Sequence, residues 1–244
     1  MGTEAVSRSR PAFYAPVGSV FGDLLALLHL PYTIWHLSYV VLGAALAPDL
    51  NWLWLAGTLA AFFFGTGVGA HALDEFKDRP LGTGLSDRVL LLLGAGAFAA
   101  VLALAALGAF LVSPWVVAWA ILGLAIAAGY ALESHRFLHS DWGFSVAWGA
   151  FPVVVGFWVQ TGSFRPSLLA FAIAATLFSF VQRTLSTPAK YVRRATTSAS
   201  VLFEESGGRR EWSRDRLLAT WERPLRLLSW GSVILSIGLL ATHL

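Results

Sequence analysis

The sequence contains no cysteine, only one methionine and few charged residues. Charged residues make up 13% of the 244 positions, whereas hydrophobic residues make up 57%. The absence of cysteine excludes disulfide bonds, thiolate metal sites and a cysteine nucleophile. A soluble domain of this length cannot bury so much apolar surface. The composition therefore predicts a polytopic integral membrane protein.

The net charge of +3 gives no reason to expect a nucleic-acid partner, because the basic residues cluster between hydrophobic runs. Residues 1–19 are polar and lack the apolar core of a signal peptide. We therefore expect the first hydrophobic run to direct insertion into the membrane.

Apolar runs occupy most of the chain. A helix needs about 20 apolar residues to cross roughly 30 Å of hydrocarbon. Seven runs approach or exceed this length: 24–47, 52–73, 89–112, 114–132, 143–162, 167–186 and 225–243. We predict an all-α integral membrane protein with about seven transmembrane helices in a single membrane domain, 1–244. Its parts are a tail (1–19), a six-span core (20–186), a basic loop with an interfacial amphipathic helix (187–223) and a last span (224–244).

The basic residues alternate between the connections of these spans. The turns at residues 47–51 and 113–114 contain no Lys or Arg. Placing the N-terminus and the segments 74–88, 133–142 and 183–226 on one side puts every Lys and Arg there except Arg165. The positive-inside rule then predicts a cytoplasmic N-terminus and an outer C-terminus, in the cell membrane.

The stretch from Ala70 to Arg88 places ionisable residues where the second span ends. His71, Asp74 and Asp78 are spaced i, i+3 and i+7, so they share one face if the helix continues. Charged groups at such a position are costly without partners, and a functional site is the default hypothesis. We expect Glu75 and Asp87 to face solvent.

The first span contains two histidines and a proline. His29 and His36 are seven residues apart and share a helix face, and Pro31 is expected to kink the helix between them. Two interpretations stay open for the histidines: hydrogen-bonded interior side chains, or the lining of a pocket.

Two further polar segments lie on the inner side. His135 and His139 are spaced i, i+4, which suits two metal ligands on a helix. A second set consists of polar and basic residues at the inner end of the sixth span. Two roles stay open for it: an anchor on lipid headgroups, or an anion clamp that faces Asp74 and Asp78. Its members are Gln182, Arg183, Lys190, Arg193 and Arg194.

The segment after these residues is polar and glycine-containing. Residues 195–210 predict a flexible loop. From Trp212 the pattern predicts an interfacial amphipathic helix, with Pro224 in the first turn of the last span.

Three places resemble the UbiA superfamily of intramembrane prenyltransferases. Asp74-x-x-x-Asp78, followed by Arg79-Pro80-Leu81-x-Thr83-Gly84-x-Ser86, is similar to the first Asp-rich motif and the element after it. Tyr130 with Arg136 is similar to the loop between helices 4 and 5. Residues 149–162, with Gly-x-x-Pro and Gln-Thr-Gly, resemble span 5 of the naphthoate-type members. The resemblance covers about residues 20–185.

The chain also departs from that family. Ala70 and His71 stand where the family has Asn-Asp. Residues 179–194, where a second Asp-rich motif is expected, contain no Asp or Glu. Family members usually have nine spans around a central cavity, against the seven predicted here.

The resemblance implies transfer of an isoprenyl group from an isoprenyl diphosphate to a lipophilic acceptor. It implies Mg²⁺ held by Asp74 and Asp78, since Mg²⁺ takes carboxylate and phosphate oxygens. His71 is a further ligand or a proton acceptor. Basic groups neutralise the leaving diphosphate, and aromatic faces stabilise a carbocation. The implied substrate-binding residues are Arg79, Tyr130, Arg136, Arg183 and Lys190.

Two other functions stay open. The missing second motif favours a non-catalytic UbiA-like membrane protein that binds an isoprenoid lipid or a membrane partner. The histidines His71, His135 and His139 would suit a metal-containing oxidoreductase or hydrolase. Membrane lipids are expected partners in every case, nucleic acid is not, and a homo-oligomer stays open.

Overall fold

The computed structural model describes residues 19–196 and 198–244. Residues 1–18 of the expected N-terminal tail, 1–19, lie outside the described residues. The main helices in chain order are α1 (Val20–Leu27), α2 (Leu30–Ala45), α3 (Trp52–Phe62), α4 (His71–Asp78), α5 (Asp87–Leu111), α6 (Trp115–Ala131), α7 (Asp141–Ser145), α8 (Phe151–Thr161), α9 (Pro166–Ala195) and α10 (Arg214–Leu240).

Shorter elements interrupt or extend these helices. Two π-helices, η1 (Phe63–Ala70) and η2 (Val146–Ala150), join α3 to α4 and α7 to α8, and a 3-10 turn, η3 (Ala241–His243), follows α10. Within the described residues, six helical segments are long and apolar enough to span a membrane, whereas α6, with 17 residues, is shorter. This agrees with the predicted all-α membrane class.

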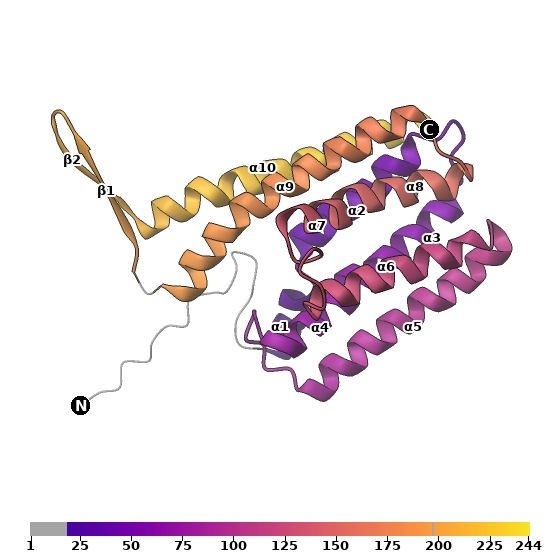
Figure 1. Cartoon of the computed structure of the whole chain (residues 1–244), viewed down its shortest axis with the longest axis horizontal. Coiled ribbons are helices and arrows are strands. Elements are labelled where there is room, and N and C mark those ends of the chain that lie inside the picture. Colours follow the sequence, from indigo (N-terminus) through magenta and orange to yellow (C-terminus); the bar gives the residue numbers. More distant parts are fainter. Residues whose placement is uncertain (1–18, 197) are drawn as a thin grey trace.

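The helices form a bundle with α2 near its centre (Figure 1). Helix α2 packs on α8 and α10, and α9 packs on α10, α7 and η2. Helix α5 packs on η1, α4 and α6 on the other side of the bundle. The α9–α10 pair extends past the remaining helices at one end. The C-terminal part of α9 and the N-terminal part of α10 therefore lie outside the bundle at that end.

The contact between α2 and α8 is close enough for backbone to meet backbone. A Cβ added to Gly43 would lie 2.0 Å from the Val153 carbonyl oxygen, and one added to Gly156 would lie 2.3 Å from that of Val40. Lipid offers no hydrophobic drive for helix association, so small residues that permit such packing are favoured at membrane helix interfaces.

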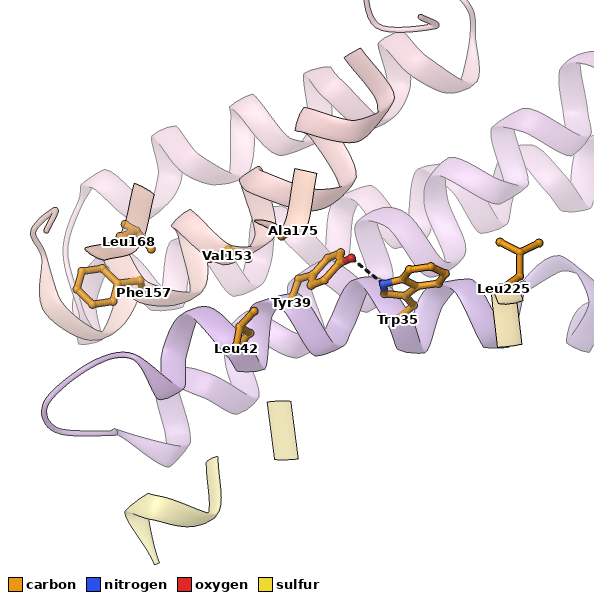
Figure 2. Packing of buried hydrophobic residues seen from close by; sticks show 8 residues of the cluster. All are labelled: Trp35, Tyr39, Leu42, Val153, Phe157, Leu168, Ala175 and Leu225. Carbon is orange, nitrogen blue, oxygen red and sulfur yellow. Dashed lines mark hydrogen bonds between the residues drawn. The ribbon is translucent and has the colours of Figure 1, made fainter. Parts of the chain in front are cut away.

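A buried cluster fills the space among α2, α8, α9 and α10 (Figure 2). Trp35 and Tyr39 are almost fully buried on α2, and the Trp35 indole N–H donates to the Tyr39 hydroxyl at 2.7 Å. Phe157 of α8 and Leu225 of α10 complete the contact. The indole and hydroxyl thereby satisfy each other away from water.

The first predicted span is broken where Pro31 was expected to kink it. Helix α1 ends at Leu27, and His29 has φ 46°, in the left-handed region. Pro31 lies in the first turn of α2, where its missing N–H is harmless. The Thr33 hydroxyl donates to the Leu28 carbonyl oxygen at 2.6 Å, satisfying one acceptor that the break leaves free.

The segment between α9 and α10 differs from the prediction. Instead of a flexible loop over 195–210, the strands β1 (Ser200–Glu205) and β2 (Gly208–Ser213) form an antiparallel hairpin that projects from the α9–α10 end (Figure 1). Helix α10 is also continuous through Pro224, which was predicted to begin a new helix. Prolines are tolerated inside membrane helices because neighbouring groups satisfy the freed carbonyl.

Connections that were predicted to share one side meet at one end of the bundle. The Asp23 carboxylate accepts from the Gly84 N–H at 2.9 Å, and Lys77 pairs with Glu133 at 2.9 Å. At the opposite end, Gln160 accepts from the Asn51 N–H at 2.8 Å. Within the described residues, the 74–88 and 133–142 connections thus meet at one end of the bundle, as predicted, whereas the side on which the N-terminus lies stays a prediction.

Candidate functional site

The π-helix η1 leads directly into the acidic segment. Its sequence, Phe-Phe-Gly-Thr-Gly-Val-Gly-Ala, has glycine at every second position from Gly65. Helix α4 continues to Asp78, so His71, Asp74 and Asp78 lie on a continuous helix, as predicted. π-Helical turns are often found at functional sites.

His71 is held from two directions. Its Nδ1 lies 3.1 Å from the Gly67 carbonyl oxygen, and its ring stacks on that of His29 with centroids 4.3 Å apart. His29 comes from the break between α1 and α2. His36 lies on α2, seven residues after His29. Its Nδ1 is 3.0 Å from the Trp148 carbonyl oxygen. The contact of His36 fits the interpretation as a hydrogen-bonded interior side chain, and the lining of a pocket stays a prediction.

Asp74 is half-buried and interacts electrostatically with Lys190 and Arg194 of α9. These partners, 116 and 120 residues from Asp74 in sequence, are two of the basic residues of the predicted clamp, and the clamp itself stays a prediction. Asp78 differs, because it lies at the exposed end of α4 with its carboxylate 3.5 Å from the Lys77 ammonium. The two carboxylates therefore have unequal surroundings.

Arg183 is committed to protein partners. Its guanidinium donates to the Tyr130 hydroxyl at 2.8 Å, to an Asp141 carboxylate oxygen at 2.7 Å and to the His139 carbonyl oxygen at 2.9 Å. It also lies 5.3 Å above the centre of the Phe144 ring. Arg183 and Tyr130, both predicted to bind substrate, thus join α9 to α6 and α7.

Glu75 is fully buried, so the expectation that it faces solvent is wrong. Its carboxylate accepts from the Leu81 N–H at 2.9 Å, and from the Thr83 N–H and hydroxyl at 2.7 and 2.9 Å. These contacts fold the 79–86 connection back onto α4. The same connection is tied by Arg79, which has a left-handed backbone and pairs with the exposed Asp87.

The loop after α6 is not helical where His135 and His139 were predicted to share a helix face. His139 instead stacks on Tyr130 and lies 3.4 Å from Glu133, and Arg136 is exposed. The hydrogen bond from Lys77 and then the charge on His139 lower the pKa of Glu133. Among residues 19–196 and 198–244, no three His, Asp or Glu side chains converge as a metal site.

An apolar cavity of about 240 Å³ lies among α3, η1, α5, α6 and α8. Most of its wall lies towards the end of the bundle where Asn51 meets Gln160. Its wall includes Thr66, five residues before His71, and Trp148. The Trp148 ring also contacts the rings of His36 and Tyr130, at 6.0 and 5.6 Å between centroids. Trp148 therefore links the apolar cavity to the polar side chains.

The two predicted magnesium ligands are carboxylates, the type of oxygen donor that Mg²⁺ prefers. Asp74 and Asp78 supply hard oxygen ligands one turn apart, and Mg²⁺ is commonly held by one or two carboxylates together with phosphate oxygens. Glu75 is excluded because three hydrogen bonds use its carboxylate.

No family model matches the chain, and no curated protein or solved structure matches it either. The relationship to the UbiA superfamily therefore stays a prediction. The sequence pattern indicated neither the burial of Glu75 nor the stacking of His29 on His71, because both depend on segments that meet only in the folded chain.

Proposed function

We propose that the protein is a Mg²⁺-dependent intramembrane prenyltransferase that moves an isoprenyl group from its diphosphate to a lipophilic acceptor. In this proposal α6 is a seventh span, the fold is a UbiA-like bundle, and the N-terminus is cytoplasmic in the cell membrane. The acceptor carries the nucleophile, and the diphosphate is the leaving group.

The observation that carries the proposal is an acidic and basic cluster, Asp74 with Lys190 and Arg194, in the same helical bundle as an apolar cavity. Trp148 lines the cavity and its ring contacts that of Tyr130, which in turn interacts electrostatically with Asp74. A ligand with a multiply charged head and a long apolar tail matches both parts. Binding sites of this kind are mostly apolar, with a few convergent polar groups.

The chain's own residues supply charge neutralisation, orientation and proton transfer. Lys190 and Arg194 neutralise the diphosphate as the carbon–oxygen bond breaks. Magnesium, when bound by Asp74 and Asp78, supplies further positive charge to the same oxygens. His71 directs Nδ1 at a carbonyl, which leaves Nε2 as the nitrogen that takes the proton released by the acceptor.

A second function is favoured by the engaged arginines. Arg183 and Arg79 already donate to protein partners, so fewer cations face a diphosphate than the sequence suggested. A protein that only retains an isoprenoid lipid needs less charge at this position. Its signature is a bound lipid without turnover.

The test measures transfer by full-length protein supplied with labelled isoprenyl diphosphates, Mg²⁺ and a membrane lipid extract as acceptor source. We expect Asp74→Asn to lower the rate on the order of 100-fold. The control, Asp49→Asn, removes the same charge at an exposed position in the connection between α2 and α3. We expect this variant to keep wild-type activity.

Equal background rates for wild type and Asp74→Asn would contradict the enzymatic function. Mass spectrometry of lipids retained through gentle purification then decides the second function. A retained isoprenoid that is lost in Gly57→Leu, which fills the apolar cavity, supports lipid binding, and protein free of lipid contradicts it.

A further inference from the structure

A second, polar cavity of about 180 Å³ lies where α9 and α10 leave the bundle. It is separate from the Asp74 cluster and from the apolar cavity. Its wall combines four arginines and two acids with two apolar residues of α10, Leu218 and Ala219. The charged members are Arg193, Arg214, Arg223, Arg226, Asp215 and Glu222.

The cavity has more positive charge than its own acids neutralise. Four guanidinium groups face two carboxylates, which leaves a net charge of +2. Glu222 is buried and accepts from Arg193, with one contact at 2.7 Å, while Arg226 is 3.7 Å from it. The Arg214 side chain donates to the Val192 carbonyl oxygen at 3.1 Å, yet its buried Nε has no hydrogen-bond partner.

This cavity lies at the point where α10 changes from charged to apolar. Arg226 is the last Lys, Arg, Asp or Glu in the sequence. Beyond it, the exposed side chains Leu227, Trp230 and Ile234 continue the helical stripe that begins at Arg223, at spacings of 4, 3 and 4 residues. A charged headgroup at the arginines would thus have apolar surface directly beneath it.

We propose that this cavity binds the phosphate of an anionic phospholipid, with the acyl chains along Leu227, Trp230 and Ile234. Guanidinium groups bind phosphate oxygens in a bidentate manner, and arginine is less strongly hydrated than lysine. Basic side chains near an anionic leaflet each strengthen binding about fivefold. The site is independent of the proposed transferase activity.

The experiment measures lipid binding to the full-length protein by native mass spectrometry from a zwitterionic detergent. Phosphatidylglycerol is added in one series, phosphatidylcholine in a second and inorganic phosphate in a third. We expect wild type to bind phosphatidylglycerol most strongly. The double variant Arg214→Gln/Arg223→Gln should bind it about 30-fold more weakly, the product of two basic side chains.

The matched control is Arg209→Gln/Arg210→Gln, which removes the same charge from the exposed hairpin. Equal weakening in this control would show only general attraction and overturn the site. Equal binding of phosphatidylcholine, or displacement of the lipid by equimolar inorganic phosphate, would overturn the lipid assignment. If the double variant does not fold, the exposed Arg223→Gln alone is expected to give about a fivefold loss, and an unchanged affinity overturns the proposal.

Discussion

Arg183 of α9 donates a 2.8 Å hydrogen bond to the hydroxyl of Tyr130 at the end of α6. Because the same guanidinium binds Asp141, the two helices are joined to α7 through one side chain. We predict that Arg183→Gln lowers the free energy of unfolding by about 2 to 3 kcal/mol, and Tyr130→Phe by about 1 kcal/mol. Melting of the full chain in detergent measures both.

The exposed hairpin residue Arg210 supplies the control for charge, as Arg210→Gln is expected to leave the melting temperature unchanged. An Arg183→Gln protein as stable as wild type would show that the contacts of Arg183 do not hold α6 and α9 together.

Because the α2 and α8 backbones are in contact, adding one methyl group at a glycine of this contact is expected to lower the free energy of unfolding. Gly43→Ala and Gly156→Ala each place Cβ against a carbonyl oxygen, which no side-chain rotation relieves. We expect a loss of about 2 kcal/mol or more for each, measured by thermal melting. Gly96→Ala, with no atom within 4 Å of the added Cβ, should be neutral or slightly stabilising. Similar stabilities for all three variants would contradict the close helix contact.

Glu75 predicts a local effect on the α4–α5 connection. Glu75→Gln replaces one acceptor oxygen by a donor and leaves a Leu81 or Thr83 donor without a partner, which costs about 1 to 3 kcal/mol. We expect faster amide hydrogen exchange over residues 79–86 and little change elsewhere. Glu204→Gln on the hairpin serves as the exposed control. Unchanged exchange in this connection would mean that Glu75 does not organise it.

The Lys77–Glu133 pair predicts a dependence of stability on pH. Because the pKa of Glu133 is lower in the folded chain than in the unfolded chain, its contribution is present above the unfolded pKa, about 4.3, and disappears as pH falls through the lowered value. The melting temperature of wild type should exceed that of Glu133→Gln at pH 6, and the difference should shrink as pH falls below the unfolded pKa. A gap that widens on acidification would contradict this sign.

A larger side chain at Gly57 would test whether the length of the isoprenyl chain matters for binding in the apolar cavity. An added side chain meets no atom within 4 Å of its Cβ at this position, yet the residue lines the cavity. Under the proposed function, Gly57→Leu should lower the rate with long isoprenyl diphosphates about tenfold and leave the shortest substrate unaffected, as several buried methylenes are displaced. Transfer assays with a series of chain lengths measure this. Gly96→Leu, exposed on α5, is the control, and equal losses at every length would contradict a tail in the cavity.

The hydropathy pattern predicted the helices well because each apolar run must become a helix in lipid. The meeting of the 74–88 and 133–142 connections was also predictable. At Pro31 a kink was predicted, whereas the helix ends at Leu27 and a new one begins at Leu30. By contrast, every side chain of the hairpin except the partly buried Trp212 is exposed, so no alternating burial pattern marked it. The burial of Glu75 depends on donors at Leu81 and Thr83 that reach it only after the connection folds back. Local spacing carries no information on such contacts.

The π-helix η1 sets the angular phase of everything that follows it. Successive residues of an α-helix are rotated by about 100°. Removing a single residue between Phe63 and Ala70 would therefore turn Asp74 away from Lys190, while leaving every side chain of the acidic segment intact. The number of residues in η1 therefore determines the direction of the Asp74 carboxylate, and the site depends on that number as well as on the carboxylate.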